Sequence, residues 1–471
     1  MKPFIYDITG IDPLQAFLNI KHLPYSLLLD SSDRKHPNSR YSFVMCKPIE
    51  TLEANDGKIT VTNWEQRLSF DGQPFAVLQS RIKAWVSKAQ SIPNLPPFQG
   101  GAAGLFGYDL GRYIEELPDT AEDKSSVPDM AVGIYDQVLA HDHLLKKSYI
   151  FTHAHNEEEA VKKRNHFINL ITEDIDKQDY KDCDLDWKSN FSRQEYINTV
   201  QKVIDYIHDG DIFQANLSQR FDAQTPDDFD PFIHYLQMRE VNPSPFATYM
   251  NLGNVKISSA SPERFITMRD KKVETSPIKG TRPRVDDIIE DRSNKEDLLS
   301  NEKDMAENTM IVDLLRNDLS KICDPDSIDV KDLCKLESFA RVHHLVSNIT
   351  AKLGYDKTAI DLLRACFPGG SITGAPKIRA MEIIEELENI RRNAYCGSIG
   401  YIGFDDTMDT NILIRTLIYE DKNVSLSVGG GIVADSIPSA EYQETLDKAD
   451  AIFRSFKQGN SQNNSLYKNA I

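Results

Sequence analysis

Cysteine is scarce in this chain, and long apolar runs are missing. The six cysteines, at positions 46, 183, 323, 334, 366 and 396, form no CxxC pair and have no zinc-ligand spacing. This pattern excludes a disulfide framework and a structural zinc site, so we expect reduced, mainly structural thiols. No window approaches the roughly 18 apolar residues of a membrane span, and the first residues do not resemble a signal peptide. We therefore expect a cytoplasmic protein.

Positive charge is also in deficit. The 54 lysines and arginines are outnumbered by 72 aspartates and glutamates, which gives a formal net charge of -18. Such a surface repels nucleic-acid phosphates and anionic membranes, so neither is expected as a partner. An anionic ligand must be bound by local groups.

Several catalytic signatures are absent from the sequence. There is no GxSxG elbow, no HExxH motif, no GxxxxGK[ST] phosphate loop and no dinucleotide fingerprint. The nucleophilic cysteine and glycine pattern of a glutaminase is missing as well. The chemistry of these enzyme classes is thus excluded, and any ammonia that the protein uses must come from elsewhere.

What remains is ordinary globular composition, with 40% apolar and 27% charged residues. A charged stretch at 157–184, predicted to be helical, separates a first half of short strand-like runs from a second half of mixed elements. We expect an N-terminal region at 1–185, a catalytic domain at 186–457 and a polar tail at 458–471. Helices and strands do not alternate regularly, so the predicted class is α+β.

The second half opens with a predicted helix and then a strand. Ser192 and Glu195 form a capping box at the start of the helix, and Gly210 marks its end. In the run IFQANLSQRF, apolar residues from Phe213 onward alternate with polar residues from Gln214 onward. One face of this strand is therefore polar and suited to line a cavity.

Lys279 lies in the segment ETSPIKGTRPR, a strand-like entry followed by a turn at Gly280 and Thr281. By itself, a lysine in a loop is usually a solvated surface charge. Glu263 lies upstream in SPERF, directly after an apolar-polar run. The context of these residues has to decide whether they carry chemistry.

Two predicted helices carry carboxylates on partly apolar faces. In NEKDMAENTMIVDLLRNDLS, Asp304 and Glu307 share a stripe with aliphatic residues, and in SAEYQETLDKADAIF the residues Glu441, Glu444 and Lys448 repeat this spacing. Magnesium needs few protein oxygens, so two such helices facing one another are suited to hold it. Surface ion pairing is the alternative interpretation.

Two glycine-rich segments follow, FPGGSITGAPK at 367–377 and VGGGI at 428–432. Their backbone amides can approach a carboxylate closely, and Pro376 is placed for the first position of a helix. Simple turns are the alternative. His343 and His344 lie in an apolar strand-like run, where a histidine is more often a core residue than a catalyst.

In order along the chain, the segments DIFQANLSQR, SPERF, PIKGTRPR, AENTMIVDLLRND, FPGGSITGAPK, YCGSIGY and VGGGIVADS resemble the chorismate-utilising enzyme family. The family includes the component I subunits of anthranilate and aminodeoxychorismate synthases and the isochorismate and salicylate synthases. Through LLLDSS and NSRYSF, the first half is similar to the two amine-forming members. The resemblance implies large β-sheets forming a sandwich flanked by helices, with the N-terminal β-rich region packed closely against it.

The resemblance also implies roles at matching positions. Lys279 and Glu263 would be the covalent nucleophile and the proton donor, His344 would transfer a proton or orient the substrate, and Glu307 and Glu444 would bind Mg²⁺. The implied contacts of chorismate are Gly280, Thr281, Tyr395, Arg415, Gly429, Gly430, Gly431 and Lys448. Asp304 stands where anthranilate synthases have glutamate, so its role beside the metal stays open.

Two positions discriminate between members of the family. Anthranilate synthases typically have alanine where this chain has Lys279, whereas C4-aminating members have lysine. The members that activate water have lysine where this chain has Gln214, and glutamine cannot act as that base. The resemblance thus implies amination of chorismate at C4, with ammonia from a separate glutamine amidotransferase in a heterodimer. An anthranilate synthase component, or a non-catalytic chorismate- or tryptophan-binding regulator, is the alternative.

The first half resembles relatives that hold L-tryptophan as an inhibitor or as a buried structural ligand. The matching positions in this chain are Ser31, Asn38, Ser39, Arg40, Tyr41, Pro245, Phe246 and Ala247. A packed sheet edge without a ligand is the alternative interpretation.

Overall fold

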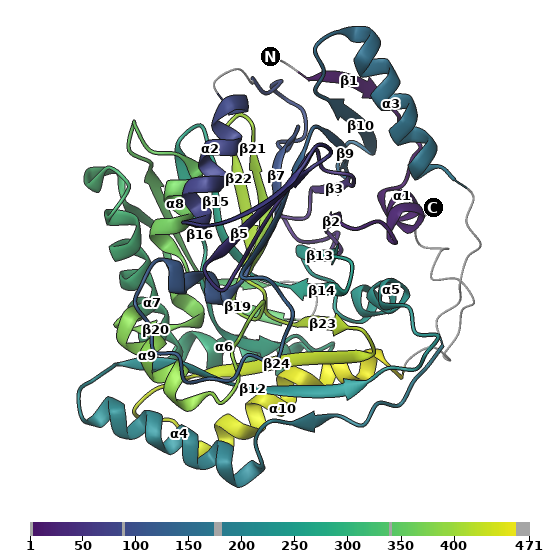
Figure 1. Ribbon diagram of the computed structural model, residues 1–471. Coiled ribbons are helices and arrows are strands. Elements are labelled where there is room, and N and C mark those ends of the chain that lie inside the picture. The colour runs from purple at the N-terminus through teal and green to yellow at the C-terminus, as the bar shows by residue number, and fades with distance from the viewer. Residues whose placement is uncertain (1–2, 87–89, 174–180, 339–341, 458–471) are drawn as a thin grey trace.

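Two large antiparallel sheets form the centre of the protein (Figure 1). The computed structural model describes residues 3–86, 90–173, 181–338 and 342–457. The predicted tail at 458–471 lies outside the described residues. Each sheet is made of a block of first-half strands next to a block of second-half strands, as expected for a closely packed N-terminal region. The boundary at 185 stays a prediction.

The first sheet joins N-terminal strands to the strands that carry the glycine run. Its order is β1 (Phe4–Asp7), β10 (Lys147–Thr152), β9 (Gln137–Asp142), β3 (Tyr41–Met45), β2 (Ser26–Asp30), β13 (Phe246–Asn251), β14 (Val255–Ser261), β23 (Thr416–Glu420), β24 (Asn423–Ile432), β12 (Gln214–Gln224) and β11 (Lys188–Ser189), with β20 (Gly374–Ala375) also paired to β12.

The second sheet has the lysine-bearing strand β17 at one end. Its order is β17 (Ile278–Pro283), β19 (Val342–Lys352), β16 (Lys272–Thr275), β15 (Arg264–Arg269), β22 (Met408–Asn411), β21 (Ser398–Gly403), β7 (Gly101–Phe106), β8 (Met130–Tyr135), β4 (Glu50–Asn55), β5 (Lys58–Asn63) and β6 (Arg67–Asp71), with β18 (Asp329–Ser338) also paired to β19.

The inner faces of the two sheets pack against each other and bury aliphatic and aromatic side chains from both, such as Leu27 and Phe43 from the first sheet and Leu105 and Tyr401 from the second. Successive side chains of a strand point to opposite faces of the sheet. Each sheet therefore also has an outer apolar face, which helices must cover. The buried clusters on the outer faces show that helices do so on both sides.

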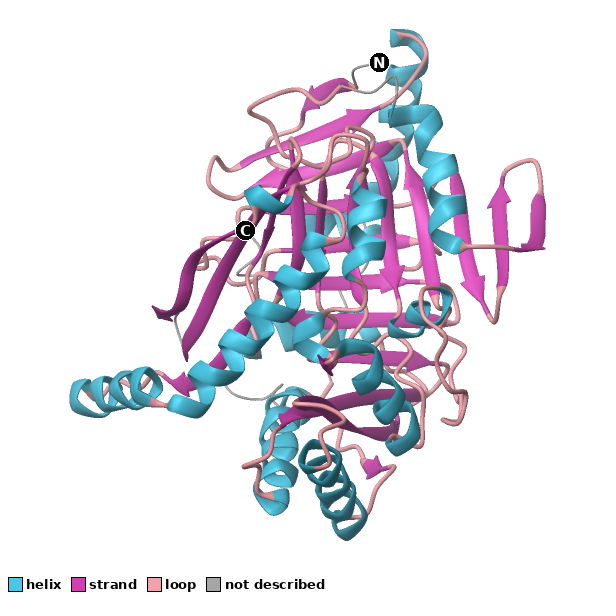
Figure 2. Cartoon of the chain, turned by 90° about the vertical axis from the view of Figure 1, so that its left-hand side faces the viewer, coloured by secondary structure: helices cyan, strands magenta, loops and turns pink. Residues whose placement is uncertain are grey.

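Helices cover each outer face of the sandwich. The first sheet is covered by α1 (Pro13–Ile20), α3 (Glu157–Ile171), α5 (Pro231–Val241) and α10 (Pro438–Ser455). The second is covered by α2 (Pro74–Val86), α7 (Glu302–Ser320) and α8 (Ala359–Cys366), and Figure 2 shows helices crossing in front of strands on this side. The remaining helical elements are α4 (Arg193–His208), α6 (Ile288–Ser300), α9 (Lys377–Leu387) and the 3₁₀ turns η1 (Tyr108–Tyr113), η2 (Pro325–Ser327) and η3 (Gly370–Ile372).

Several local predictions are confirmed. Ser192 and Glu195 form the capping box of α4, which ends at His208 just before Gly210, and α7 and α10 occupy the segments predicted as helices. All six cysteines are free thiols. In the described part of the chain, no helix is long and apolar enough to cross a membrane.

Three local predictions are wrong or only partly right. The helix predicted through residue 184 ends at Ile171. Pro376 is the N-cap of α9 rather than its first residue, because its backbone is extended. Phe213 precedes β12 and is 69% exposed, so the predicted alternation of faces begins one residue later.

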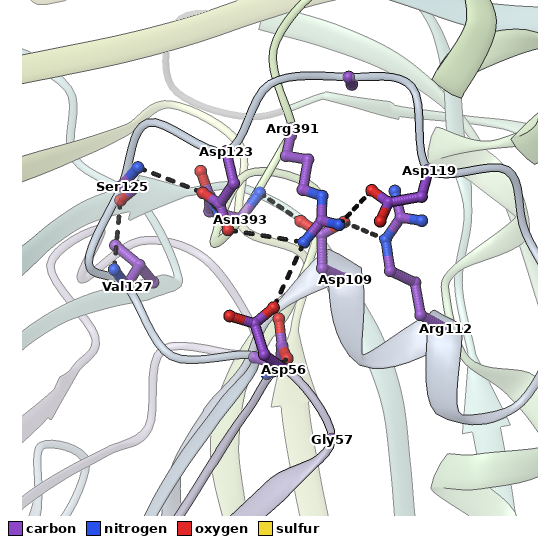
Figure 3. Close-up of polar contacts among 12 residues, drawn as sticks. Asp56, Gly57, Asp109, Arg112, Asp119, Asp123, Ser125, Val127, Arg391 and Asn393 are labelled. Atoms are coloured by element: carbon purple, nitrogen blue, oxygen red, sulfur yellow. Dashed lines mark hydrogen bonds and ion pairs between the residues drawn. The ribbon is translucent and has the colours of Figure 1, made fainter.

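Charged groups also fasten the two halves of the chain to each other (Figure 3). The guanidinium of Arg391 lies between three carboxylates of the first half, with Nη1 at 3.8 Å from Asp56 and 3.5 Å from Asp123, and Nη2 paired with Asp119. The backbone N–H of Asn393 donates to the buried Asp109 carboxylate over 2.8 Å. These contacts tie the β4–β5 turn, η1 and the loop after η1 to the segment before β21.

Candidate active site

The structure joins Lys279 and Glu263 through a single residue. Lys279, on β17, donates from Nζ to the backbone carbonyl of Ser371 over 3.3 Å. The Ser371 hydroxyl donates to Glu263 Oε1 over 2.8 Å. Ser371 lies in η3, within the glycine-rich FPGGSITGAPK segment. The predicted nucleophile and the predicted proton donor thus share one site.

Glu263 lies in an environment that favours its protonated form. Its side chain comes after β14 and is 7% exposed. Burial raises the pKa of the Glu263 carboxyl, against the opposing effects of the Ser371 hydroxyl and the Lys279 ammonium. A buried carboxyl that holds its proton near neutral pH is suited to be a general acid.

Gly280 makes the turn beside Lys279 possible. Its φ of +77° lies in the left-handed region, at a bulge where the pairing of β17 with β19 shifts register. A Cβ there would lie 2.9 Å from Leu298 Cδ1 and 3.0 Å from Asp304 Cγ. Only glycine fits this position without strain. Asp304 of α7 lies behind the turn, and its carboxylate is 3.3 Å from Nη1 of Arg282. Arg282 is on β17, the strand that also carries Lys279.

Thr281 and His344 meet across β17 and β19. The Thr281 hydroxyl and His344 Nδ1 are 2.8 Å apart. Burial lowers the pKa of His344 to about 4, and the nearby Arg415 cation acts in the same direction. His344 is therefore a neutral imidazole near pH 7, whereas the neighbouring His343 is held by Asp291 and Ser338.

The glycine run of β24 leaves room for functional side chains on both of its faces. A Cβ at Gly431 would lie 2.1 Å from Gln214 Nε2 and 3.6 Å from Lys279 Nζ. One at Gly430 would lie 3.3 Å from Glu444 Oε1 and 3.4 Å from a carboxylate oxygen of Glu441. The strand thus passes between the lysine side of the site and the carboxylates of α10.

Three glutamates, Glu307, Glu441 and Glu444, lie within electrostatic range of Lys279, Lys303 and Lys448 beside this strand. Burial raises the pKa of Glu307 on α7 and of Glu441 on α10. Burial also acts to raise the pKa of Glu444, but Lys448, Lys303 and Lys279 together outweigh it and bring the pKa below its usual value. Lys448 is 2.7 Å from Glu444 and donates to the Gly429 carbonyl over 2.8 Å.

This donor set fits a magnesium ion that keeps water and substrate ligands. Two carboxylates from facing helices are enough protein oxygens for such an ion, and a divalent cation relieves the repulsion between them. Among the described residues, no group of three or more histidine, cysteine, aspartate or glutamate side chains stands ready as a complete metal cage. The arrangement suits a metal bound together with its substrate.

Arg415 and Tyr395 complete the predicted contacts. Arg415 precedes β23, is exposed and forms no ion pair with any residue in the described ranges, so its guanidinium is free to receive a carboxylate. Tyr395 is 5% exposed, and the Arg392 guanidinium lies 5.7 Å from the centre of its ring.

Two residues at the site were missed as functional by sequence reasoning. Ser371 was passed over because its motif was interpreted through its glycines alone. Glu441 was recognised on the α10 stripe but received no role, although it is buried and pairs with Lys303 over 3.7 Å. Burial is the property that separates it from an ordinary surface glutamate.

The residues predicted to bind tryptophan surround a cavity of about 330 Å³ between the two sheets. Its wall includes seven of the eight predicted positions, namely Ser31, Asn38, Arg40, Tyr41, Pro245, Phe246 and Ala247. Ser39 lines a neighbouring cavity instead, because the 33–40 loop separates the two. Arg40 is already paired with Asp142, while Arg264 stacks on the Phe246 ring at 4.9 Å.

Comparison with known proteins agrees with this geometry. A family model described as chorismate binding enzyme matches residues 25–454. The chain is 45% identical to aminodeoxychorismate synthase component 1 of Escherichia coli over 93% of this chain and 94% of that protein. It is 36% identical to anthranilate synthase component 1 of Acetivibrio thermocellus over 95% and 93%.

A solved structure confirms the predicted sandwich fold. Anthranilate synthase component I from Streptococcus pneumoniae superposes with a TM-score of 0.80 and 34% identity, covering 89% of this chain and 93% of that one. Matches of this extent, together with the residues gathered around Lys279, lead to one conclusion: the chain is an enzyme of the chorismate-binding family.

Proposed function

We propose that this chain is the component of an aminodeoxychorismate synthase that converts chorismate and ammonia into 4-amino-4-deoxychorismate. The observation that carries the proposal is the link from Lys279 through Ser371 to Glu263. It joins a nucleophile to a buried acid, as covalent displacement of a poor leaving group requires. The 45% identity to the aminodeoxychorismate synthase of Escherichia coli, against 36% to the anthranilate synthase of Acetivibrio thermocellus, supports the same assignment.

The first step breaks the bond between C4 and its hydroxyl. Neutral Lys279 attacks C2 of chorismate, the ring double bond shifts, and the C4 oxygen leaves with the proton of Glu263 as water. The proton lost by the lysine nitrogen replaces the one given up by Glu263. The 2.8 Å bond from Ser371 holds the Glu263 carboxyl in place during this transfer.

In the second step, ammonia displaces Lys279 from the covalent intermediate. Ammonia attacks C4, the double bond shifts back, and the C2–N bond breaks as the lysine leaves. The net change exchanges the C4 hydroxyl for an amino group and releases one water. Because the chain shows no glutaminase signature, we propose that a separate glutamine amidotransferase subunit supplies the ammonia.

In this proposal, groups of the site hold the two carboxylates of chorismate. Arg415 offers a fork of donors, and the glycine run of β24 lets a ligand approach the backbone closely. His344 is neutral and engaged with Thr281, which favours a role in orienting Thr281 and the substrate over proton donation.

Magnesium is a further part of the proposal, with Glu307 and Glu444 as its protein ligands and Glu441 close by. A bound magnesium ion would offset the negative charge of the ring carboxylate. Lys303 and Lys448, which neighbour these glutamates, would adjust as the ion enters.

The decisive test is Lys279→Ala in the full chain, assayed with chorismate, magnesium and free ammonia. We expect the parent enzyme to show a mass increase equal to chorismate less one water, and the variant to show neither adduct nor turnover. Lys272→Ala, at an exposed position of β16, is the matched control. The covalent step would be excluded if the variant kept full turnover and the parent enzyme formed no adduct.

The same assay separates the alternatives. Fluorescent anthranilate as the product would identify an anthranilate synthase component, whereas a mass corresponding to aminodeoxychorismate supports the proposed activity. Failure to consume chorismate at any magnesium concentration would point to a non-catalytic regulator. Adding a glutamine amidotransferase with glutamine in place of ammonia tests the partner independently.

We also propose that the cavity between the sheets binds L-tryptophan. Its volume suits a ligand of this size, and its wall combines aromatic and aliphatic side chains with charged groups such as Arg264 and Asp409. Extracts of the denatured protein should contain tryptophan, or added tryptophan should raise the melting temperature. If neither is observed, the cavity is a packed sheet edge without this ligand.

A further inference from the structure

Strand β6 forms an open edge of the second sheet. It is the last strand in the sheet order, and all five of its residues are exposed. Leu68 and Phe70 keep 43% and 38% of their surface accessible. Within the described ranges, neither Arg67 nor Asp71 forms an ion pair. An edge with free backbone groups and half-covered apolar side chains is a template for pairing with another strand.

The register of β5 and β6 shows which backbone groups face outward. Asn63 and Gln66 form a hydrogen-bonded pair at the turn, with N···O at 3.0 Å. Hydrogen-bonded and non-hydrogen-bonded pairs alternate along an antiparallel ladder. Leu68, opposite Val61, therefore bonds to β5, as does Phe70. The N–H and C=O groups of the intervening residues, Arg67, Ser69 and Asp71, point away from the sheet.

The sequence of this edge is complementary to itself in one antiparallel register. Read as Arg-Leu-Ser-Phe-Asp, it has a centre at Ser69. A twofold axis through Ser69 places Arg67 opposite Asp71 of a second copy, and Leu68 opposite Phe70 of that copy. This register pairs the three residues whose backbone groups face outward, and it brings opposite charges together at both ends.

The apolar side chains fit the same register. Leu68 and Phe70 lie on the face that carries Ile59 and Val61, both buried under α2. Pairing with a second copy extends this face and covers the part that one copy leaves exposed. Cross-strand pairs of apolar and of oppositely charged side chains each stabilise a sheet.

We propose that β6 pairs with β6 of a second copy of this chain, making a homodimer whose second sheet continues across the interface. Charged residues on an edge strand usually prevent such pairing. Here their opposite signs, placed symmetrically about Ser69, make self-pairing attractive. Five-residue strands bury little area, so a weak, concentration-dependent dimer is expected, with a Kd in the micromolar range or above.

Charge reversal gives a sharp test with its own internal control. R67D places like charges opposite each other twice in the dimer, and D71R does the same with positive charges. Each variant alone should associate roughly tenfold or more weakly than the parent in sedimentation equilibrium from about 1 to 300 µM. An equimolar mixture of R67D and D71R restores both opposite-charge pairs, and we expect it to form heterodimers.

Several outcomes would overturn the proposal. They are a parent that stays monomeric throughout this range, an R67D variant that dimerises like the parent, or a mixture that associates no better than either variant alone. Folding of each variant is checked by circular dichroism and thermal melting. Chorismate turnover should be unchanged, because β6 and the Lys279 strand β17 lie at opposite ends of the sheet.

Discussion

Replacing Ser371 by alanine removes the hydroxyl that supports the proposed proton donor. Ser371 Oγ donates to Glu263 Oε1 over 2.8 Å, and the Glu263 side chain is 93% removed from solvent, since 7% remains exposed. The backbone carbonyl of Ser371, which accepts from Lys279, is retained in the variant. The substitution therefore removes the hydrogen bond to Glu263 and keeps the hydrogen bond to Lys279.

The size of the effect follows from the type of bond. A hydrogen bond to a charged or ionising group contributes about 1.5–3 kcal/mol, and 1.36 kcal/mol corresponds to a tenfold change in rate. We expect kcat to fall by roughly 10- to 100-fold if the bond is needed in the transition state. Because the Ser371 hydroxyl lowers the pKa of Glu263, its loss raises that pKa further. The alkaline limb of kcat should move to higher pH.

The assay is the pH dependence of chorismate turnover at a constant concentration of free-base ammonia. Ser371→Thr keeps a hydroxyl at this position. It should therefore retain most of the parent kcat, with the alkaline limb of the pH profile at the parent position. A limb that stays in place or moves to lower pH in Ser371→Ala, or a kcat above half of the parent value, would refute the role of Ser371.

Three further perturbations test other parts of the structure. Glu307→Gln removes one carboxylate from the proposed magnesium site, so the magnesium concentration for half-maximal turnover should rise about tenfold or more. Burial holds the pKa of His234 at about 3. As the pH falls, the unfolded chain therefore binds this proton first, and between about pH 7.5 and 5 His234 alone lowers the unfolding free energy by about 2 kcal/mol. His234→Gln should remove this part of the loss in urea titrations at the two pH values. Arg391→Met should cost about 1–2 kcal/mol in the same titration because three carboxylates lose a shared cation, whereas Arg292→Met, at an exposed pair with Glu296, should change stability by less than about 0.5 kcal/mol.

Features that depend on neighbours along the chain were predictable from the sequence. The capping box of Ser192 and Glu195 works within one helical turn, and the carboxylate spacings on α7 and α10 follow from helix periodicity. The family resemblance supplied the sandwich and the set of site residues, which composition and spacing alone could not have given. The end of α3 was misjudged because charged residues continue beyond Ile171 without an apolar face to bury.

Features that depend on distant segments escaped prediction. Ser371 lies 108 residues from Glu263 and 92 from Lys279, so nothing local marks its hydroxyl as their link. Ser39 shares a loop with the cavity residues, yet it lines the other side of that loop. A sequence pattern fixes which residues lie near each other along the chain, but not which side of a loop faces a given cavity.

The glycine run shows how the two kinds of information combine. The sequence VGGGI indicates only that backbone can approach a ligand there. In the structure, the missing Cβ of Gly431 faces Gln214 and Lys279, while that of Gly430 faces Glu441 and Glu444. Neighbouring residues of a strand point their side chains to opposite faces. Two consecutive glycines are therefore needed to leave room on both faces of β24. This accounts for the consecutive Gly430 and Gly431 between Lys279, the proposed nucleophile, and the carboxylates of Glu441 and Glu444, where a lone glycine would leave one group blocked.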